Sequence, residues 1–390
     1  MTKTQLRYLA SLVVEPATEP GPTIRLEDLE SGSGCLVGDL SVLAPEGQNR
    51  FGVGDVLFSK LRPYLAKSML VTSAAQGSGE FLCMRPRTGT IARFLLYATL
   101  SRPWLDHAAM TSYGTKMPRT SWEQMSTLRL HLPGPLEQQR IADFLDDRVV
   151  RIDQIIAARG EQLKLLNERV ASAVERLLTP QEGSGRWIRV KEVSSKVGSG
   201  KTPRGGADAY VLNGIPFLRS QNVHDDGLRL ADVVYISEET DSEMAGTRVH
   251  VGDVLLNITG ASLGRCCVAT SNVSPANVSQ HVCIIRPDGI RSEVLALLLR
   301  SKPVRDQVGL AQVGGNREGL NFEQVRELRF WYPYDAMVWQ RSQSLERDAV
   351  RGATSLRRSI SLFQEYKQSL ITAAVTGQID VTTAGSGIPG

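Results

Sequence analysis

The fold is decided by residues 133–180, which have the sequence PGPLEQQRIADFLDDRVVRIDQIIAARGEQLKLLNERVASAVERLLTP. Apolar residues recur there at spacings of three and four, as on one face of an α-helix. They are Ile141, Leu145, Ile152, Ile156, Leu163, Leu166, Val170 and Leu177. Pro133 and Pro135 precede the pattern, where proline is tolerated, and Pro180 ends it. The sequence therefore predicts a helix of about 42 residues, roughly 63 Å long at 1.5 Å per residue.

The apolar stripe of this segment is narrow, and charged residues fill the opposite face. A narrow stripe is typical of a coiled-coil seam, so the helix needs a partner helix. Residues 336–377 have a similar length, and Gly377 stands where a helix commonly ends. Their stripe comprises Val338, Leu345, Ala349, Leu356, Ile360, Phe363, Leu370 and Ala374. We expect the two helices to pack antiparallel; one long helix inside a single large domain is the alternative.

Length and composition indicate an ordinary globular protein. A chain of 390 residues is long enough for two or three domains. Its hydrophobic fraction of 42% is typical of globular proteins. The formal net charge of +4 does not by itself demand a polyanionic partner, so the local distribution of charge matters more.

The cysteines and the N-terminal sequence favour a cytoplasmic protein. Five cysteines form no CxxC pair and are odd in number, which argues against a disulfide framework and a zinc site. The first residues make a poor signal peptide, and no apolar run is long enough to span a bilayer. We expect a cytoplasmic protein with no metal and no cofactor.

The sequence contains an internal repeat. VGDVL at 53–57 returns at 251–255, and WEQMSTLRL at 122–130 returns as FEQVRELRF at 322–330. LLYATLSRP at 95–103 returns as LALLLRSKP at 295–303, and LLNERVASAV at 165–174 returns as LFQEYKQSLI at 362–371. Each match lies about 200 residues from its copy and the order never changes, which indicates a duplicated unit.

The repeat divides the chain into globular unit, helix, globular unit and helix. Short strands and helices alternate in both globular parts, so the predicted fold class is α+β. We expect two similar globular domains separated by two long antiparallel helices that form a coiled coil. The expected boundaries are 1–132 and 181–335 for the globular domains, 133–180 and 336–378 for the helices, and 379–390 for a flexible tail.

Several stretches, taken together, resemble one known family. PGPLEQQRIADFLD at 133–146 is similar to the start of that family's first conserved helix. GSGKTPRGG at 198–206, followed by GIPFLRSQNV at 214–223, resembles the opening of one of its recognition domains. VGDVLFSKLRPYLAK at 53–67 and EYKQSLITAAVTGQIDV at 365–381 also resemble family segments. The family is the specificity (S) subunit of Type I restriction–modification systems, and the motifs occur in its order over nearly the whole chain.

The resemblance implies a function. Each globular unit is expected to be a target-recognition domain that reads one half of a bipartite DNA site. The paired helices are expected to set the spacer and to dock two methyltransferase (M) subunits, through which restriction (R) subunits join the complex. An S subunit carries no catalytic residues. This chain departs from the pattern at YPYDAMVWQRSQ (332–343), where the second helix lacks the Glu-Gln pair of the first.

The sequence shows no complete catalytic motif among those considered. The Asn/Asp-Pro-Pro-aromatic motif of amino-methyltransferases is missing. GSGKT at 198–202 resembles a phosphate-binding loop, but Ser195 replaces its first glycine and Pro203 follows where its helix would begin. Two alternatives remain open, namely a coiled-coil scaffold protein and an unrecognised DNA-modifying enzyme.

Basic and polar residues in loops are candidates for DNA contacts. Lysine and arginine bind phosphates, whereas Arg, Asn and Gln also read base edges. The candidates in the first unit are Lys60, Arg62, Tyr64, Lys67, Tyr113, Lys116 and Arg119. Those in the second are Lys201, Arg204, Arg219, Gln221, Asn222, Asn316 and Arg317. A solvated surface is the alternative for any single residue.

Apolar residues of the two helices are candidates for partner contacts. They are Leu136, Ile141, Leu145, Leu166, Val170, Leu345, Phe363 and Leu370. Some helix residues lie beyond a single pairwise stripe, such as Leu165 and Leu362, and helices of an M subunit could cover them.

Overall fold

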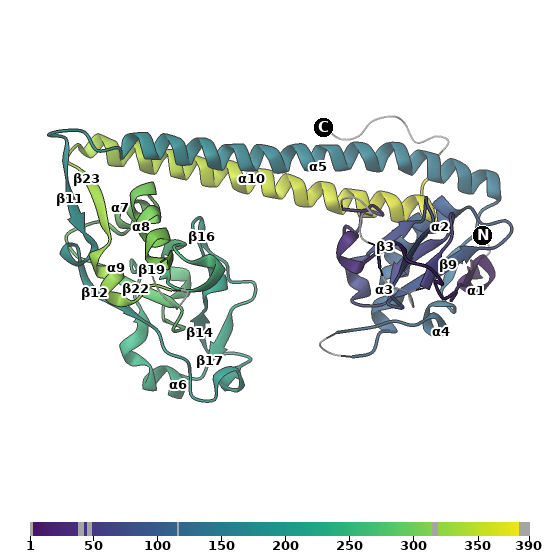
Figure 1. Cartoon of the computed structure of the whole chain (residues 1–390), viewed down its shortest axis with the longest axis horizontal. Helices are drawn as coiled ribbons and strands as arrows, with labels where there is room; N and C mark the ends of the chain where they lie inside the picture. Colours follow the sequence, from purple (N-terminus) through teal and green to yellow (C-terminus); the bar gives the residue numbers. More distant parts are fainter. Residues whose placement is uncertain (1–2, 38–42, 45–48, 115–116, 314–318, 382–390) are drawn as a thin grey trace. The chain divides into compact units, whose positions relative to one another are not determined.

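The computed structural model describes residues 3–37, 43–44, 49–114, 117–313 and 319–381 (Figure 1). The chain divides into two compact units. Unit 1 comprises residues 1–162 and 356–390, and unit 2 comprises residues 163–355. Each long helix therefore contributes residues to both units. Most of the expected tail, residues 382–390, lies outside the described residues, as do Lys116, Asn316 and Arg317.

Both predicted long helices are confirmed. Helix α5 spans Pro135–Leu177 and α10 spans Ala336–Val375. Pro135 is the first helical residue of α5, where its missing N–H costs nothing. After α10, Gly377 has a left-handed backbone with φ 71°, and the Gln378 N–H donates to Ala373 O at 2.8 Å. This closure satisfies a carbonyl that the helix leaves unpaired.

Unit 1 contains two four-stranded sheets. The first has the order β2-β9-β6-β7 and is antiparallel throughout. The second has the order β4-β3-β8-β5, with β3 parallel to β8. The strand bounds, with the ribbon β1–β10, are β1 Lys3–Gln5, β2 Ala10–Leu12, β3 Gly21–Ile24, β4 Leu43–Ala44, β5 Asn49–Phe51, β6 Val56–Ser59, β7 Ser68–Leu70, β8 Ala75–Gly77, β9 Phe81–Pro86 and β10 Arg129–His131.

The shorter helices of unit 1 pack on the first sheet. The chain turns at Ser101, because α2 ends at Leu100 and α3 begins at Arg102, one residue before Pro103. Ser121 caps α4 by accepting from the Gln124 N–H. The bounds are α1 Leu6–Leu9, α2 Ala92–Leu100, α3 Arg102–Met110, α4 Trp122–Met125, and the 3₁₀ turns η1 Leu26–Asp28 and η2 Pro63–Leu65.

Unit 2 repeats this architecture. Its sheet β12-β22-β19-β20 corresponds to β2-β9-β6-β7, and its five-stranded sheet β13-β17-β14-β21-β18 again holds a parallel pair, β14 with β21. The strand bounds, with the ribbons β11–β23 and β15–β16, are β11 Gly185–Arg189, β12 Ser194–Ser199, β13 Tyr210–Val211, β14 Ile215–Leu218, β15 Val223–His224, β16 Gly227–Leu228, β17 Val234–Ile236, β18 Arg248–Val249, β19 Val254–Asn257, β20 Cys266–Val268, β21 Ala276–Val278, β22 Val282–Pro287 and β23 Arg329–Pro333.

The helices of unit 2 follow the order of unit 1. Helices α7 and α8 correspond to α2 and α3, and α9 corresponds to α4. The bounds are α6 Glu238–Glu243, α7 Ser292–Leu299, α8 Lys302–Val313, α9 Phe322–Glu327, and the 3₁₀ turns η3 Val190–Glu192, η4 Gly206–Ala209, η5 Ser220–Asn222, η6 Ala245–Thr247, η7 Gly260–Ser262 and η8 Ser271–Val273.

A buried ion pair explains why VGDVL occurs twice. Asp55 and Asp253, the aspartates of the two copies, are each 1% exposed. Arg85 donates to both oxygens of Asp55 at 2.9 and 3.0 Å. Arg286 donates to both oxygens of Asp253 at 2.8 and 2.9 Å. Each aspartate also accepts a backbone N–H three residues earlier in the chain, so the same carboxylate ties a turn to the neighbouring strand in both units.

The two helices run antiparallel within each unit. In unit 1, Ile141 and Leu145 of α5 share a hydrophobic core with Ile371 and Ala374 of α10. An ion pair at 2.6 Å joins Lys367 to Asp153 on the same face. In unit 2, Val174 of α5 and Leu178, just after its end, share a core with Trp339 and Leu345 of α10. Burial of each large apolar side chain contributes about 1.5–3 kcal/mol.

Candidate nucleic-acid interface

The structure brings the two basic loops of unit 1 together. The Arg62 N–H donates to Pro118 O at 2.8 Å, and the Thr120 N–H donates to Lys60 O at 3.0 Å. Tyr113 and Arg119 exchange two backbone hydrogen bonds of 2.9 Å. The segment 60–67 and the described residues 113–114 and 117–120, which lie far apart in the sequence, therefore form one joined surface.

An unusual backbone presents Arg62 and Tyr64 on that surface. Arg62 and Ala66 have left-handed backbones, with φ 48° and 50°, on either side of the 3₁₀ turn η2. This conformation costs about 1–2 kcal/mol for a residue with a side chain. The corresponding residues of unit 2 are Gly260 and Gly264, with φ 71° and 82°, so both loops have left-handed residues at equivalent positions.

The candidates in unit 1 differ in how far their side chains are engaged. Arg62 and Tyr64 are exposed, and among the described residues neither side chain has a hydrogen bond or an ion pair. In contrast, the Lys67 ammonium donates to Leu26 O at 2.6 Å, and the Lys60 ammonium donates to Gly79 O. Arg119 forms an ion pair with Glu80 at 3.0 Å. Arg62 is therefore the best-placed cation of the group.

In unit 2, Lys201 and Arg204 lie in an exposed loop after β12. The loop is anchored at Gly200, where an added Cβ would lie 1.6 Å from Val278 O. The short 3₁₀ turn η4 follows the loop, rather than the α-helix that a phosphate-binding loop requires. The loop therefore lacks the geometry of a nucleotide-binding site.

Asn222 corrects a sequence expectation. It is fully buried, accepts from the Arg219 N–H at 2.9 Å and donates to Arg229 O at 2.9 Å. Both ends of its amide are used within the chain, so it stabilises a turn and is not available to DNA. Arg219 and Gln221 lie beside it, and both donate to Asp232.

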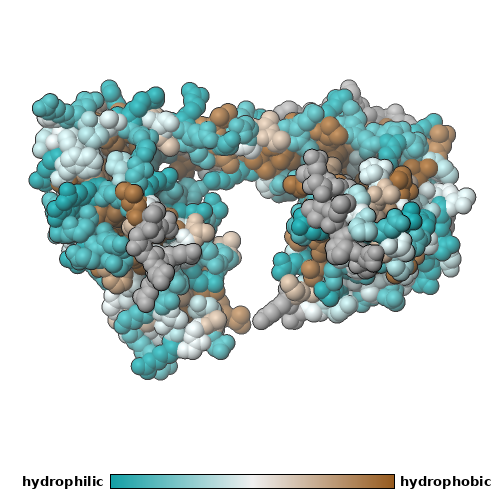
Figure 2. Space-filling view, viewed as in Figure 1, coloured by the Kyte–Doolittle hydropathy of each residue, from teal (hydrophilic) through white to brown (hydrophobic). Residues whose placement is uncertain are grey.

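The helix candidates fall into three groups by exposure. Ile141 and Leu145 are buried in the core of unit 1 and are not available to a partner in this conformation. Leu136 is 68% exposed. The remaining candidates are half-buried, and they are Leu166, Val170, Leu345, Phe363 and Leu370. In Figure 2, hydrophobic residues interrupt the hydrophilic surface of the paired helices.

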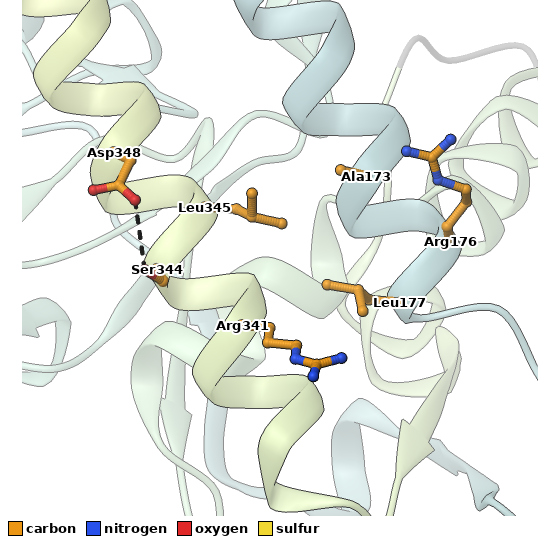
Figure 3. Close-up of a pocket in the computed structure, with 7 residues that line it drawn as sticks. All are labelled: Ala173, Arg176, Leu177, Arg341, Ser344, Leu345 and Asp348. Atoms are coloured by element: carbon orange, nitrogen blue, oxygen red, sulfur yellow. Dashed lines mark hydrogen bonds between the residues drawn. The ribbon is translucent and has the colours of Figure 1, made fainter.

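A groove lies in unit 2 between the end of α5 and the start of α10 (Figure 3). Its apolar floor is formed by Ala173 and Leu177 of α5 and Leu345 of α10. Charged and polar side chains border the groove, and they are Arg176, Arg341, Ser344 and Asp348. An apolar floor between charged edges suits the side of another helix.

Three buried cysteines of unit 2 are unsuited to nucleophilic catalysis. Burial raises the pKa of Cys266, Cys267 and Cys283 to about 12, so these thiols remain protonated at neutral pH and are poor nucleophiles. No group of three or more metal-ligating side chains occurs in the part of the chain that the structure describes. The same part contains no helix long and apolar enough to cross a membrane.

Comparisons with known proteins agree with the sequence resemblance. The Type I restriction enzyme EcoDI specificity subunit of Escherichia coli is 26% identical over 172 residues. A solved structure from a study of "complex assembly and conformational transition of the type I R-M system" is similar with a TM-score of 0.67, at 16% identity, over 97% of this chain and 98% of that chain. The resemblance to Type I specificity subunits is confirmed. This solved structure shares the fold of the chain, in which two globular units are joined by long helices.

The sequence similarity to the curated relative covers less than half of either protein. The aligned region spans 43% of this chain and 36% of the length of the curated relative. No family model matches the chain. The HsdS subunit of Thermoanaerobacter tengcongensis is 18% identical over 97% of both chains, with a TM-score of 0.45.

Some candidate residues were missed by the sequence reasoning. The loop of unit 2 that corresponds to residues 60–67 is residues 258–265, and it carries exposed Arg265 together with Thr259 beside His281. The repeat itself could have identified this loop, because VGDVL fixes the alignment of the two copies on its N-terminal side. Its low charge made it inconspicuous.

Proposed function

We propose that this chain is the non-catalytic specificity subunit of a Type I restriction–modification complex and that it recognises double-stranded DNA. Each unit reads one half of a bipartite target. The observation that carries the proposal is the joined surface of unit 1. There two distant loops present Arg62, whose side chain has no partner among the described residues, beside the exposed ring of Tyr64. Arginine binds phosphates and guanines, and tyrosine can donate a hydrogen bond to a phosphate.

The second unit supports the same role. Its loop 258–265 has left-handed residues, Gly260 and Gly264, at the positions of Arg62 and Ala66. Lys201 and Arg204 are exposed cations in the loop after β12. Arg219 and Gln221 remain weaker candidates, because both donate to Asp232 in the free chain.

We propose that two M subunits dock on the paired helices, and that R subunits join through them. Large apolar side chains on these helices remain exposed, and they are Leu136, Val150, Leu165, Met337, Val350 and Leu362. The groove between Leu177 and Leu345 offers a further apolar floor. Helices of M that cover these residues would turn a two-helix seam into a larger bundle.

The test is duplex binding by the chain assembled with its M subunits. We expect sequence-specific binding whose logarithmic affinity falls linearly with the logarithm of salt concentration between about 50 and 200 mM. A complex without DNA affinity would favour the scaffold alternative. Methyl transfer or cleavage by the purified chain alone would favour the enzyme alternative.

Replacement of Arg62 by glycine should weaken DNA binding without damage to the loop. Glycine accepts the left-handed backbone that Arg62 adopts at φ 48°, so only the guanidinium is lost. We expect a uniform loss of affinity across sequences and a salt slope smaller by about one. Filter or fluorescence binding over a salt series measures both quantities.

Ala66→Gly is the matched control, because it changes the other left-handed residue of the same loop. This variant relieves the same kind of backbone strain and removes no charge. Its DNA affinity and salt slope should equal those of the wild type. If both variants bind DNA alike, Arg62 contacts no phosphate.

Deletion of one heptad from each helix tests whether the helices set the spacer. The Lys367–Asp153 ion pair places residues 152–158 opposite 362–368 of the antiparallel helix, not opposite the 352–358 expected from the sequence. Residues 152–158 and 362–368 are therefore removed together. The deletion shortens the pair by roughly 10.5 Å, or about three base pairs at roughly 3.4 Å each. We expect a shorter spacer between methylated half-sites or a loss of binding. Retention of the wild-type spacer at full affinity would contradict this role.

A further inference from the structure

Four polar side chains of unit 2 form a hydrogen-bonded group on its surface. Thr202 donates to the Gln280 Oε1 at 2.9 Å, and the Thr259 hydroxyl lies 2.8 Å from the His281 Nδ1. The Gln280 Nε2 lies 3.4 Å from the His281 Nε2, which links the two pairs. We call these residues the polar quartet. Its members come from three separate segments, which the fold brings to one place.

The quartet occupies the same position as the basic surface of unit 1. The Ile258 N–H donates to His281 O at 3.0 Å, as the Lys60 N–H donates to Glu80 O at 2.8 Å. A bridge joins Thr259 to Gly319, as a bridge joins Leu61 to Arg119. These two backbone contacts of the site are therefore shared by both units.

The side chains at the two equivalent sites differ. Unit 1 carries charged groups there, since Arg119 pairs with Glu80. Unit 2 carries two hydroxyls, a carboxamide and an imidazole. Both units keep the Asp–Arg ion pair on the sheet that carries the site. Exposed groups that differ at equivalent sites are what two readers of different half-sites require.

The chemistry of the quartet suits bases better than phosphates. Neutral hydroxyl and carboxamide groups contribute little to the electrostatic attraction of phosphates, but they match the donors and acceptors of base edges. Lys201 flanks Thr202 in the chain and Arg204 follows two residues later, and both are exposed. Cations beside a neutral polar centre give the arrangement of a base-reading site held in register by phosphate contacts.

We propose that the polar quartet reads base edges in the half-site recognised by unit 2, with the Gln280 carboxamide directed at a purine that offers an acceptor beside a donor, as adenine does in the major groove. The inference rests on the proposed DNA-recognition function. In the free chain the four side chains satisfy one another, and on DNA they exchange these bonds for bonds to bases. Lys201 and Arg204 hold the adjacent phosphates.

The test uses Gln280→Ala in the full chain assembled with its M subunits, on a library of duplexes with randomised half-sites. We expect relaxed preference at one base pair of a single half-site, and affinity for the best wild-type target lower by about ten- to a hundredfold. The salt slope should stay unchanged, because no charge is lost. Lys201→Ala should instead weaken all sequences alike and lower the slope by about one.

Gln181→Ala is the matched control, because it removes the same side chain from an exposed position between α5 and β11 of the same unit. It should bind as the wild type does. Thermal unfolding of each variant verifies the fold. If the wild type shows a sequence preference that Gln280→Ala and His281→Ala both retain, the quartet does not read bases. A wild-type complex with no sequence preference would overturn the proposed function as well.

Discussion

Asp55→Asn is expected to lower the free energy of unfolding of unit 1 by about 3 kcal/mol. The Asp55 carboxylate is 1% exposed and accepts from Arg85 twice and from the Gly52 N–H at 2.8 Å. Asparagine has the same shape but only one acceptor oxygen, so at least one of these donors is left unpaired. Removal of one partner from a buried ion pair costs about 3–5 kcal/mol, and the lower end applies because the Arg85 side chain is 45% exposed.

The destabilisation caused by Asp55→Asn should depend on pH. Burial alone disfavours the charged form of Asp55, but the hydrogen bonds from Arg85 and the Gly52 N–H and the Arg85 charge outweigh it, so the pKa of Asp55 lies below its ordinary value. A lowered pKa in the folded state stabilises the fold above the unfolded-state value of about 3.9. This stability is lost as the pH falls through the folded-state pKa. The variant and the wild type should therefore differ at pH 7 and converge in acid.

Hydrogen exchange resolved by peptide distinguishes the two units. Asp55→Asn should accelerate exchange in β6 and β9 of unit 1 and leave β19 and β22 of unit 2 unchanged. Asp253→Asn, in the equivalent ion pair, should show the reverse pattern. An equal response of both units to either variant would mean that they do not unfold as separate bodies.

The long helices and the repeat were predictable because both are periodic signals. A stripe such as Ile141, Leu145 and Ile152 specifies a helix face without knowledge of the rest of the fold. The meaning of VGDVL was not predictable, since Asp55 binds an arginine 30 residues further along the chain. Such a pairing depends on strand order, which local patterns do not determine.

The candidate site was predictable in part. The sequence places Lys60, Arg62 and Tyr64 in one loop, but the hydrogen bonds that join this loop to Pro118 appear only in the fold. Asn222 was chosen as a DNA contact although it is buried. The sequence alone does not distinguish an amide that caps a buried turn from one that faces solvent. The quartet was missed because none of its members carries a permanent charge.

Gln138→Leu is expected to destabilise unit 1 by about 3 kcal/mol or more. The Gln138 side chain is fully buried at the start of α5. Its Nε2 donates to Gly89 O and Pro133 O, both at 2.8 Å, and its Oε1 accepts from the Ile91 N–H at 2.8 Å. Leucine leaves all three backbone groups unpaired, and each unsatisfied buried group costs about 1–3 kcal/mol.

The start of α10 differs from that of α5 and lacks its Glu-Gln pair. The residue in the place of Gln138 is Trp339, which is 6% exposed and whose ring centroid lies 5.0 Å from that of Tyr332. The second helix thus begins with apolar packing where the first begins with hydrogen bonds. Trp339→Gln should therefore also destabilise, because that site offers an aromatic contact in place of the three backbone partners that surround Gln138.

Urea unfolding of Gln138→Leu, with Gln139→Leu as its matched control, measures this difference. Gln139 is the adjacent residue, only half-buried, and donates to Asp143 at 3.0 Å. Its loss should cost less than about 1 kcal/mol, as for a surface substitution. Exchange at the Ile91 amide should rise in the Gln138 variant alone. Equal stability of the two leucine variants would mean that water replaces the lost amide, and that the first helix does not depend on Gln138 for its attachment to unit 1.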